Sequence, residues 1–113
     1  MSETGLIVAV ERRGDAVWAR LNGELDLALV DHLEAALPVV HRGETLVVDL
    51  GELRFIDSVG VRVLMRLDVE ARADEWSLVL VRARGHVKRV LELCHVHERI
   101  TMLDDPATMA SRG

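Results

Sequence analysis

The residues best suited to chemistry are Asp57-Ser58-Val59-Gly60, where an apolar stretch gives way to an amphipathic helical pattern. The hydroxyl of Ser58 can accept a hydrogen bond from one of the unpaired N–H groups that open a helix, so Ser58 is predicted to be the N-cap. The same N–H groups favour an anion. A phosphate on Ser58 would add a charge of about −1.5 to −2 beside Asp57 without unfolding the helix. The pattern predicts an exposed serine whose modification changes partner binding but not the fold.

Catalysis by this chain is not predicted. Ser58 lacks the Gly-x-Ser-x-Gly context of a hydrolase nucleophile and an identifiable histidine base. Cys94, His95 and His97 are residue types that ligate zinc, and a small metallohydrolase remains an alternative. Solvated histidines near the C-terminal dipole of a helix explain that cluster equally well, and no second ligand cluster accompanies it. The prediction is therefore no enzyme activity, no metal and no cofactor.

Length, charge and cysteine content restrict the class of protein. The chain of 113 residues predicts a single domain spanning 1–113. A formal net charge of −5 opposes binding to nucleic acid or to an anionic membrane. Cys94 is the only cysteine, which excludes an intrachain disulfide, and charged residues interrupt every apolar run before it reaches the ~18 residues of a membrane span. A cytoplasmic protein without membrane insertion is expected.

An N-terminal hairpin is predicted from two alternating segments. Residues 6–12 and 16–22 each place apolar side chains on one face, and Gly14-Asp15 between them is suited to a tight turn. On the second segment, Trp18 and Arg20 are predicted to lie on an exposed face of the sheet.

Helices and strands then alternate along the chain. Asp26 is predicted to cap a first helix that ends near Pro38, and the helix from Ser58 is predicted to carry Asp68 on its solvent side. In the next helix, Leu93 is predicted to point inward. The further expected elements are strands at 45–49, 76–81 and 100–103, a helix at 86–94, and a helix start at Pro106.

This order predicts an α/β fold. The N-terminal hairpin contributes an antiparallel edge, and the strands that follow helices are expected to run parallel through right-handed crossovers. The helices are expected to pack on this mixed β-sheet.

Three segments together resemble those of a STAS domain of the bacterial anti-sigma factor antagonist family. They are residues 22–26 (Asn-Gly-Glu-Leu-Asp), 47–50 (Val-Val-Asp-Leu) and 55–60 (Phe-Ile-Asp-Ser-Val-Gly), followed by Val61 and Val63. The resemblance extends over nearly the whole chain in the expected order. It implies a STAS-like sheet and a protein that, when unphosphorylated, binds an anti-sigma factor and thereby releases a sigma factor.

The resemblance also implies residue roles and partners. The anti-sigma factor in such systems is commonly a serine kinase, and the serine it phosphorylates matches Ser58. Phosphorylation ends the interaction and a separate phosphatase restores it, while Asp26 matches an acidic residue near the kinase-docking surface. Val59 departs from the family pattern, because many members carry a second serine or threonine there, so an alternate phosphate acceptor is absent.

The predicted partner-binding face is built around the start of the helix at Ser58. Besides Ser58, its members are Asp26, Asp57, Val59, Gly60 and Arg62. For Ser58 the structural alternative is a plain N-cap, and for Asp26 it is capping of the first helix. An alternative function keeps the fold but makes the chain a constitutive STAS adaptor subunit of a transporter or signalling complex, without phosphoregulation.

Overall fold

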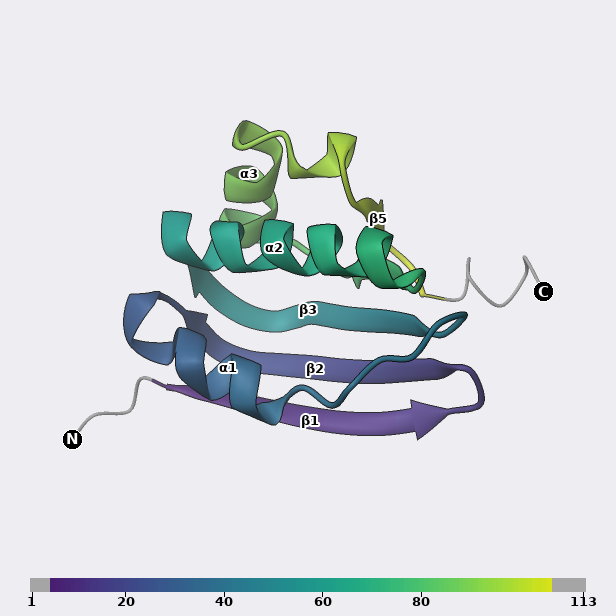
Figure 1. Cartoon of the computed structure of the whole chain (residues 1–113). Helices are drawn as coiled ribbons and strands as arrows, with labels where there is room; N and C mark the ends of the chain where they lie inside the picture. The colour runs from purple at the N-terminus through teal and green to yellow at the C-terminus, as the bar shows by residue number, and fades with distance from the viewer. Residues whose placement is uncertain (1–4, 107–113) are drawn as a thin grey trace.

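The computed structural model describes residues 5–106, and a five-stranded mixed sheet forms its framework (Figure 1). The strands lie in chain order: β1 (Leu6–Arg13), β2 (Ala16–Leu25), β3 (Thr45–Ile56), β4 (Ser77–Val81) and β5 (Thr101–Leu103). β1 and β2 form the predicted antiparallel hairpin, and β2 to β5 run parallel to one another. The predicted α/β fold with an antiparallel N-terminal edge is confirmed.

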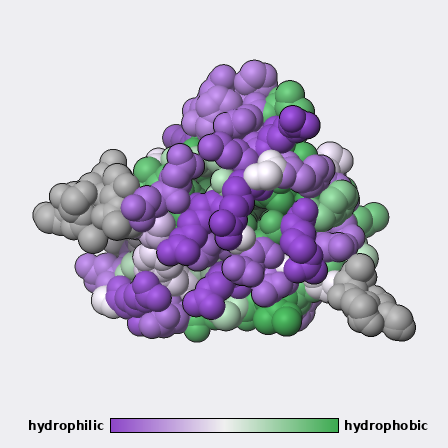
Figure 2. Space-filling view, turned by 180° about the vertical axis from the view of Figure 1, so that it is seen from behind, coloured by the Kyte–Doolittle hydropathy of each residue, from purple (hydrophilic) through white to green (hydrophobic). Residues whose placement is uncertain are grey.

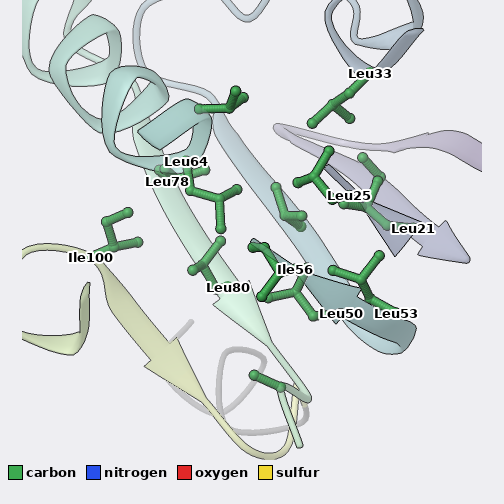
Figure 3. Close-up of a cluster of buried hydrophobic side chains, with 14 of the residues drawn as sticks. Leu21, Leu25, Leu33, Leu50, Leu53, Ile56, Leu64, Leu78, Leu80 and Ile100 are labelled. Carbon is green, nitrogen blue, oxygen red and sulfur yellow. The ribbon is translucent and has the colours of Figure 1, made fainter. Parts of the chain in front are cut away.

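The helices all bury their apolar residues on one face of the sheet. They are α1 (Val30–Ala36), α2 (Ser58–Asp74) and α3 (Gly85–Leu93), with short 3₁₀ turns η1 (Leu27–Leu29) and η2 (Val96–Glu98). Figure 3 shows Leu33 of α1 and Leu64 of α2 directed toward the strand side chains. This single cluster holds most of the apolar core, including the fully buried Leu21, Leu50 and Leu80.

The opposite face of the sheet carries no helix within residues 5–106. Val47, Val79 and Val81 are buried there in a small separate cluster, with Trp18 packed at its side. Arg20 is exposed on the same face, so the placement of Trp18 and Arg20 agrees with the alternation of β2. Viewed from this side, hydrophilic residues cover most of the surface (Figure 2).

Strands β2 and β3 are longer than the sequence pattern predicts. β2 was expected to break at Gly23, yet it continues to Leu25, since Gly23 adopts φ +124° and passes close to the Gly5 carbonyl. β3 was expected to end at Asp49, yet it continues to Ile56. The pairing of β2 with β3 shifts register twice beyond Arg20, and such bulges disturb the alternation on which the expected boundaries rested.

The second half of β3 extends beyond the end of β4, and α3 packs beside it. β4 pairs with β3 only as far as Asp49, after which both Nε and Nη2 of Arg84 donate hydrogen bonds to the Gly51 carbonyl at 3.1 and 2.9 Å. Leu93, predicted to point inward, instead lies at the end of α3 with 72% of its surface exposed. The helix expected from Pro106 would fall on residues 107–113, outside the described residues.

Asp68 corrects the predicted solvent face of α2, because it is only 5% exposed. Its Oδ2 accepts hydrogen bonds from Arg72 Nε at 3.0 Å and Arg99 Nη2 at 3.4 Å. Arg72 also donates to the Arg99 carbonyl at 2.9 Å. The helical periodicity predicted the Asp68 carboxylate on the solvent side of α2. Instead Arg99, which is distant in the sequence, pairs with this carboxylate and so links α2 to the segment that precedes β5.

No helix among residues 5–106 is long and apolar enough to cross a lipid bilayer.

Replacing the Asp68 carboxylate should therefore weaken the fold. Asp68→Ala is expected to lower the free energy of unfolding by about 1–2 kcal/mol, since two charge-assisted hydrogen bonds are lost while both arginines stay half exposed to water. Asp74→Ala, at the exposed end of the same helix, is the control and should change it by less than about 0.5 kcal/mol. Urea titration followed by circular dichroism measures both, and equal effects would contradict the assigned role.

Candidate functional site at the start of helix α2

The ends of β2 and β3 bring together acidic residues that are distant in sequence. Leu25 pairs with Ile56 across the two parallel strands, and the N–H of Asp57 donates to the Leu25 carbonyl at 3.3 Å. Asp26 and Asp57, the residues that follow this pair, therefore lie beside each other at one edge of the sheet. The predicted association of Asp26 with the start of α2 is thus present in the fold.

Asp57, and not Ser58, is the N-cap of α2. Its extended backbone precedes the first helical residue, and its Oδ1 accepts a hydrogen bond from the Gly60 N–H at 2.9 Å. Ser58 occupies the first helical position and is exposed. The Asp57 carboxylate takes the capping role that was predicted for the Ser58 hydroxyl. The Ser58 oxygen is therefore left available at the surface.

Gly60 lies beneath this surface and brings α2 close to the strands. A Cβ at Gly60 would approach the Leu25 carbonyl oxygen and Ile56 Cγ1, each at 2.7 Å. Both contacts are shorter than a side chain tolerates, so glycine is required by packing. The residue is buried, and its contribution to the predicted binding face is to fix the position of Ser58 from below.

Asp26 immediately precedes the 3₁₀ turn η1, and helix α1 starts only at Val30. The predicted cap is absent, because the Asp26 side chain makes no capping hydrogen bond. Its Oδ1 is buried and finds no hydrogen-bond partner within the described part of the chain. An unpartnered buried carboxylate oxygen costs stability, so capping does not explain this residue.

The remaining residues of the predicted partner-binding face differ in exposure. Val59 is half-buried, and Arg62 is exposed on the next turn of α2. An ion pair between Arg66 and Glu34 joins α2 to α1 behind them. Helix α2 is thus held at its start by the strand ends and near its middle by α1.

Apolar residues near Ser58 were missed by the sequence reasoning. Leu27 in η1 is 72% exposed, and Phe55, three residues before Ser58, is 38% exposed. The Phe55 ring stacks on His86 of α3, with ring centroids 5.3 Å apart and planes inclined by 7°. In the sequence, Leu27 directly follows Asp26, and Phe55 lies two positions before Asp57. The available signal was therefore a large apolar residue within two positions of each acidic residue.

A hollow of about 860 Å³ lies elsewhere, on the helix-free face, and includes none of the predicted site residues. Two ion pairs lie within its lining, Arg13–Glu11 at 3.0 Å and Arg82–Asp49 at 4.0 Å. Arg13 also lies over the Trp18 ring at 4.4 Å. Because the carboxylates of Glu11 and Asp49 are paired with arginines of the same hollow, the start of α2 is the stronger candidate site.

The histidine-rich segment after α3 does not form a ligand cluster. Cys94 is exposed, and His95 Nδ1 lies 3.1 Å from a Glu98 carboxylate oxygen. In residues 5–106, no group of three or more histidine, cysteine, aspartate or glutamate side chains is arranged to hold a metal ion. The metallohydrolase alternative gains no support from this geometry.

A mixed sheet covered by helices on one face, with an exposed serine at the start of a helix that follows the central strand, defines a small α/β domain. A family model described as Mlab, STAS domain matches residues 8–104. The chain therefore belongs to the STAS domain family, as the sequence motifs indicated.

The chain is also similar to a known relative and to solved structures. BtrV of Bordetella bronchiseptica, named as an anti-sigma factor antagonist, is 39% identical over 77 residues, which cover 66% of each chain and thus just under two thirds of BtrV. An anti-sigma factor antagonist structure from Thermotoga maritima matches with a TM-score of 0.82 at 16% identity, covering 93% of this chain and 92% of that one. The anti-sigma factor antagonist SpoIIAA, in its unphosphorylated form, matches with a TM-score of 0.60 at 23% identity, covering 95% and 99%. At such identities the two structures establish the shared fold.

The capping assignment can be tested with two neighbouring variants. Asp57→Ala is expected to lower the free energy of unfolding by about 1 kcal/mol, because the Gly60 N–H loses its acceptor. Ser58→Ala should leave it within about 0.5 kcal/mol of the original protein, since an exposed first-turn hydroxyl is not the cap. Guanidinium titration distinguishes the two, and a larger loss for Ser58→Ala would restore the serine as cap.

Asp26 is expected to lower the free energy of unfolding of the protein. Asp26→Asn removes the charge from a buried, unpartnered oxygen beside Asp57, so the free energy of unfolding is expected to rise by about 1 kcal/mol. Asp31→Asn, exposed in the first turn of α1, serves as the control with a change below about 0.5 kcal/mol. A destabilised Asp26→Asn protein in the same titration would show that Asp26 has a structural role after all.

Proposed function

We propose that this chain is an anti-sigma factor antagonist: its unphosphorylated form binds an anti-sigma factor and so releases the sigma factor. The names of BtrV and SpoIIAA, together with membership of the STAS family, support this function. The action is binding, without catalysis by the chain itself or binding to nucleic acid, and it takes place in the cytoplasm, where sigma factors act.

Phosphorylation of Ser58 is the proposed switch, and the observation that carries it is that Ser58 is exposed while Asp57 alone caps α2. The serine hydroxyl is free to accept a phosphoryl group, because no helix hydrogen bond depends on it. The helix start also tolerates the new anion, since the first N–H groups of α2 carry partial positive charge. Modification therefore changes the charge of the surface while the fold is retained.

The effect on binding follows from the neighbouring carboxylates. Asp26 and Asp57 already make this edge of the sheet acidic, and a phosphate adds about −1.5 to −2 charge. A partner surface matched to two carboxylates and a neutral hydroxyl meets excess negative charge after modification, and like-charge contact in a desolvated interface costs affinity. The anti-sigma factor is proposed to be the serine kinase, with Asp26 at its docking surface, and a phosphatase to reverse the modification.

The switch predicts opposite behaviour for two substitutions at Ser58. Ser58→Ala should bind the anti-sigma factor within about threefold of the original protein, while Ser58→Asp should bind at least about tenfold more weakly because it adds charge beside Asp57. Calorimetric titration with the purified anti-sigma factor measures all three affinities. Equal affinities would refute the switch.

A kinase assay separates regulation from constitutive binding. Incubation with the anti-sigma factor and ATP should place one phosphate on Ser58, detected by mass spectrometry, and none on the Ser58→Ala protein. Absence of phosphate, together with stable co-purification of a transporter or signalling subunit, would favour the constitutive adaptor instead.

A further inference from the structure

We propose that Leu27 and Phe55 are apolar anchors that determine recognition of the anti-sigma factor on either side of Ser58. This inference rests on the proposed function and adds a component of binding that does not involve charge. The anti-sigma factor is expected to present apolar depressions for these two side chains next to the part of its surface that receives Ser58.

Leu27 is largely exposed to solvent, at 72% of its surface. It lies in η1, whose three residues include none that is buried, two positions after the fully buried Leu25. The Leu25–Ile56 pairing that brings Asp26 near Asp57 also fixes where η1 begins, because η1 follows Leu25 after one residue. Burial of a leucine side chain is favourable, so an apolar partner surface at this point would gain affinity.

Phe55 lies next to the same Leu25–Ile56 pair, and its side chain is already held in one orientation. It comes immediately before the paired Ile56, and its ring stacks on His86 with nearly parallel planes. An aromatic side chain fixed in this way loses little conformational freedom on binding, which is a property of interface anchors. His86 is accordingly a positioning residue for Phe55.

Leu27 directly follows Asp26 and Phe55 lies two residues before Asp57, so each anchor is next in the chain to one residue of the acidic centre formed by Asp26 and Asp57. Apolar contacts that exclude water around a charged centre lower its local dielectric constant, so a charge added at Ser58 has a larger effect than it would in open solvent. In this proposal the apolar contacts contribute affinity, and the acidic centre makes binding sensitive to the charge at Ser58. This division explains how one phosphate can disrupt a complex without touching most of its contacts.

The chain provides a matched control of the same residue type. Leu93 at the end of α3 has the same 72% exposure as Leu27 but lies outside η1 and the start of α2. Leu27→Ser and Leu93→Ser therefore remove identical side chains of identical exposure. The first variant tests the proposed anchor, and the second measures the general effect of losing an exposed leucine.

The experiment uses the serine-kinase anti-sigma factor that co-purifies with the original protein, isolated and titrated calorimetrically against each variant. Leu27→Ser and Phe55→Ala are expected to weaken binding at least tenfold, His86→Ala about threefold, and Leu93→Ser less than twofold. Thermal unfolding of each free variant confirms that it is folded. A Leu27→Ser/Ser58→Asp double variant should lose less affinity than the product of the two single effects, because without the anchor the charge added at Ser58 is better solvated; a loss equal to that product would contradict this coupling.

Ser58→Asp in the same series separates this inference from the proposed function. If Ser58→Asp weakens binding while Leu27→Ser remains within twofold of the original protein, the anchors are refuted and the switch stands. Equal weakening by Leu27→Ser and Leu93→Ser also refutes the anchors. If Ser58→Asp binds as tightly as the original protein, the switch fails, whatever Leu27→Ser does.

Discussion

The hydrogen bond from the Gly60 N–H to the Asp57 carboxylate is the interaction on which the site depends. It satisfies one of the free N–H groups at the start of α2, and it leaves the adjacent Ser58 hydroxyl without a structural duty. Gly60 contributes a second constraint, because any side chain there would collide with the Leu25 carbonyl and with Ile56. The Asp57 cap and the close approach of Gly60 to the strands together fix the direction in which Ser58 faces the surface.

The sheet explains why these residues meet at one edge. β2 and β3 are the two longest strands, and their parallel pairing continues through two register shifts to Leu25 and Ile56. Both strands therefore end at the same level, which places Asp26 beside Asp57 although 31 positions separate them along the chain. α3 packs against the part of β3 that extends past β4, and it brings His86 to Phe55. A shorter β3, as the alternation predicted, would not produce this arrangement.

The sequence predicted the order of elements, because strand alternation and helical periodicity are local properties. It assigned the cap to Ser58, since serine and aspartate are both good capping residues and only the backbone path chooses between them. Asp68 was placed in solvent for a similar reason: its partner Arg99 lies 31 positions away, beyond any local pattern. The exposed leucine and phenylalanine beside the acidic residues depend on which strands pair, and periodicity alone carries no such information.

The structure separates what holds the domain together from what its surface presents. The core lies between the helices and one face of the sheet, and the start of α2 reaches it through Gly60 and the Leu25–Ile56 pair. Ser58 touches none of these supports through its hydroxyl, so a change of charge there need not be transmitted into the core to have an effect. Asp26 shows the opposite balance, because its buried, unpartnered oxygen is unfavourable for folding. A surface can act as a switch without any conformational change when its charged centre rests on a rigid cap, and the contacts around Asp57 provide that rigidity.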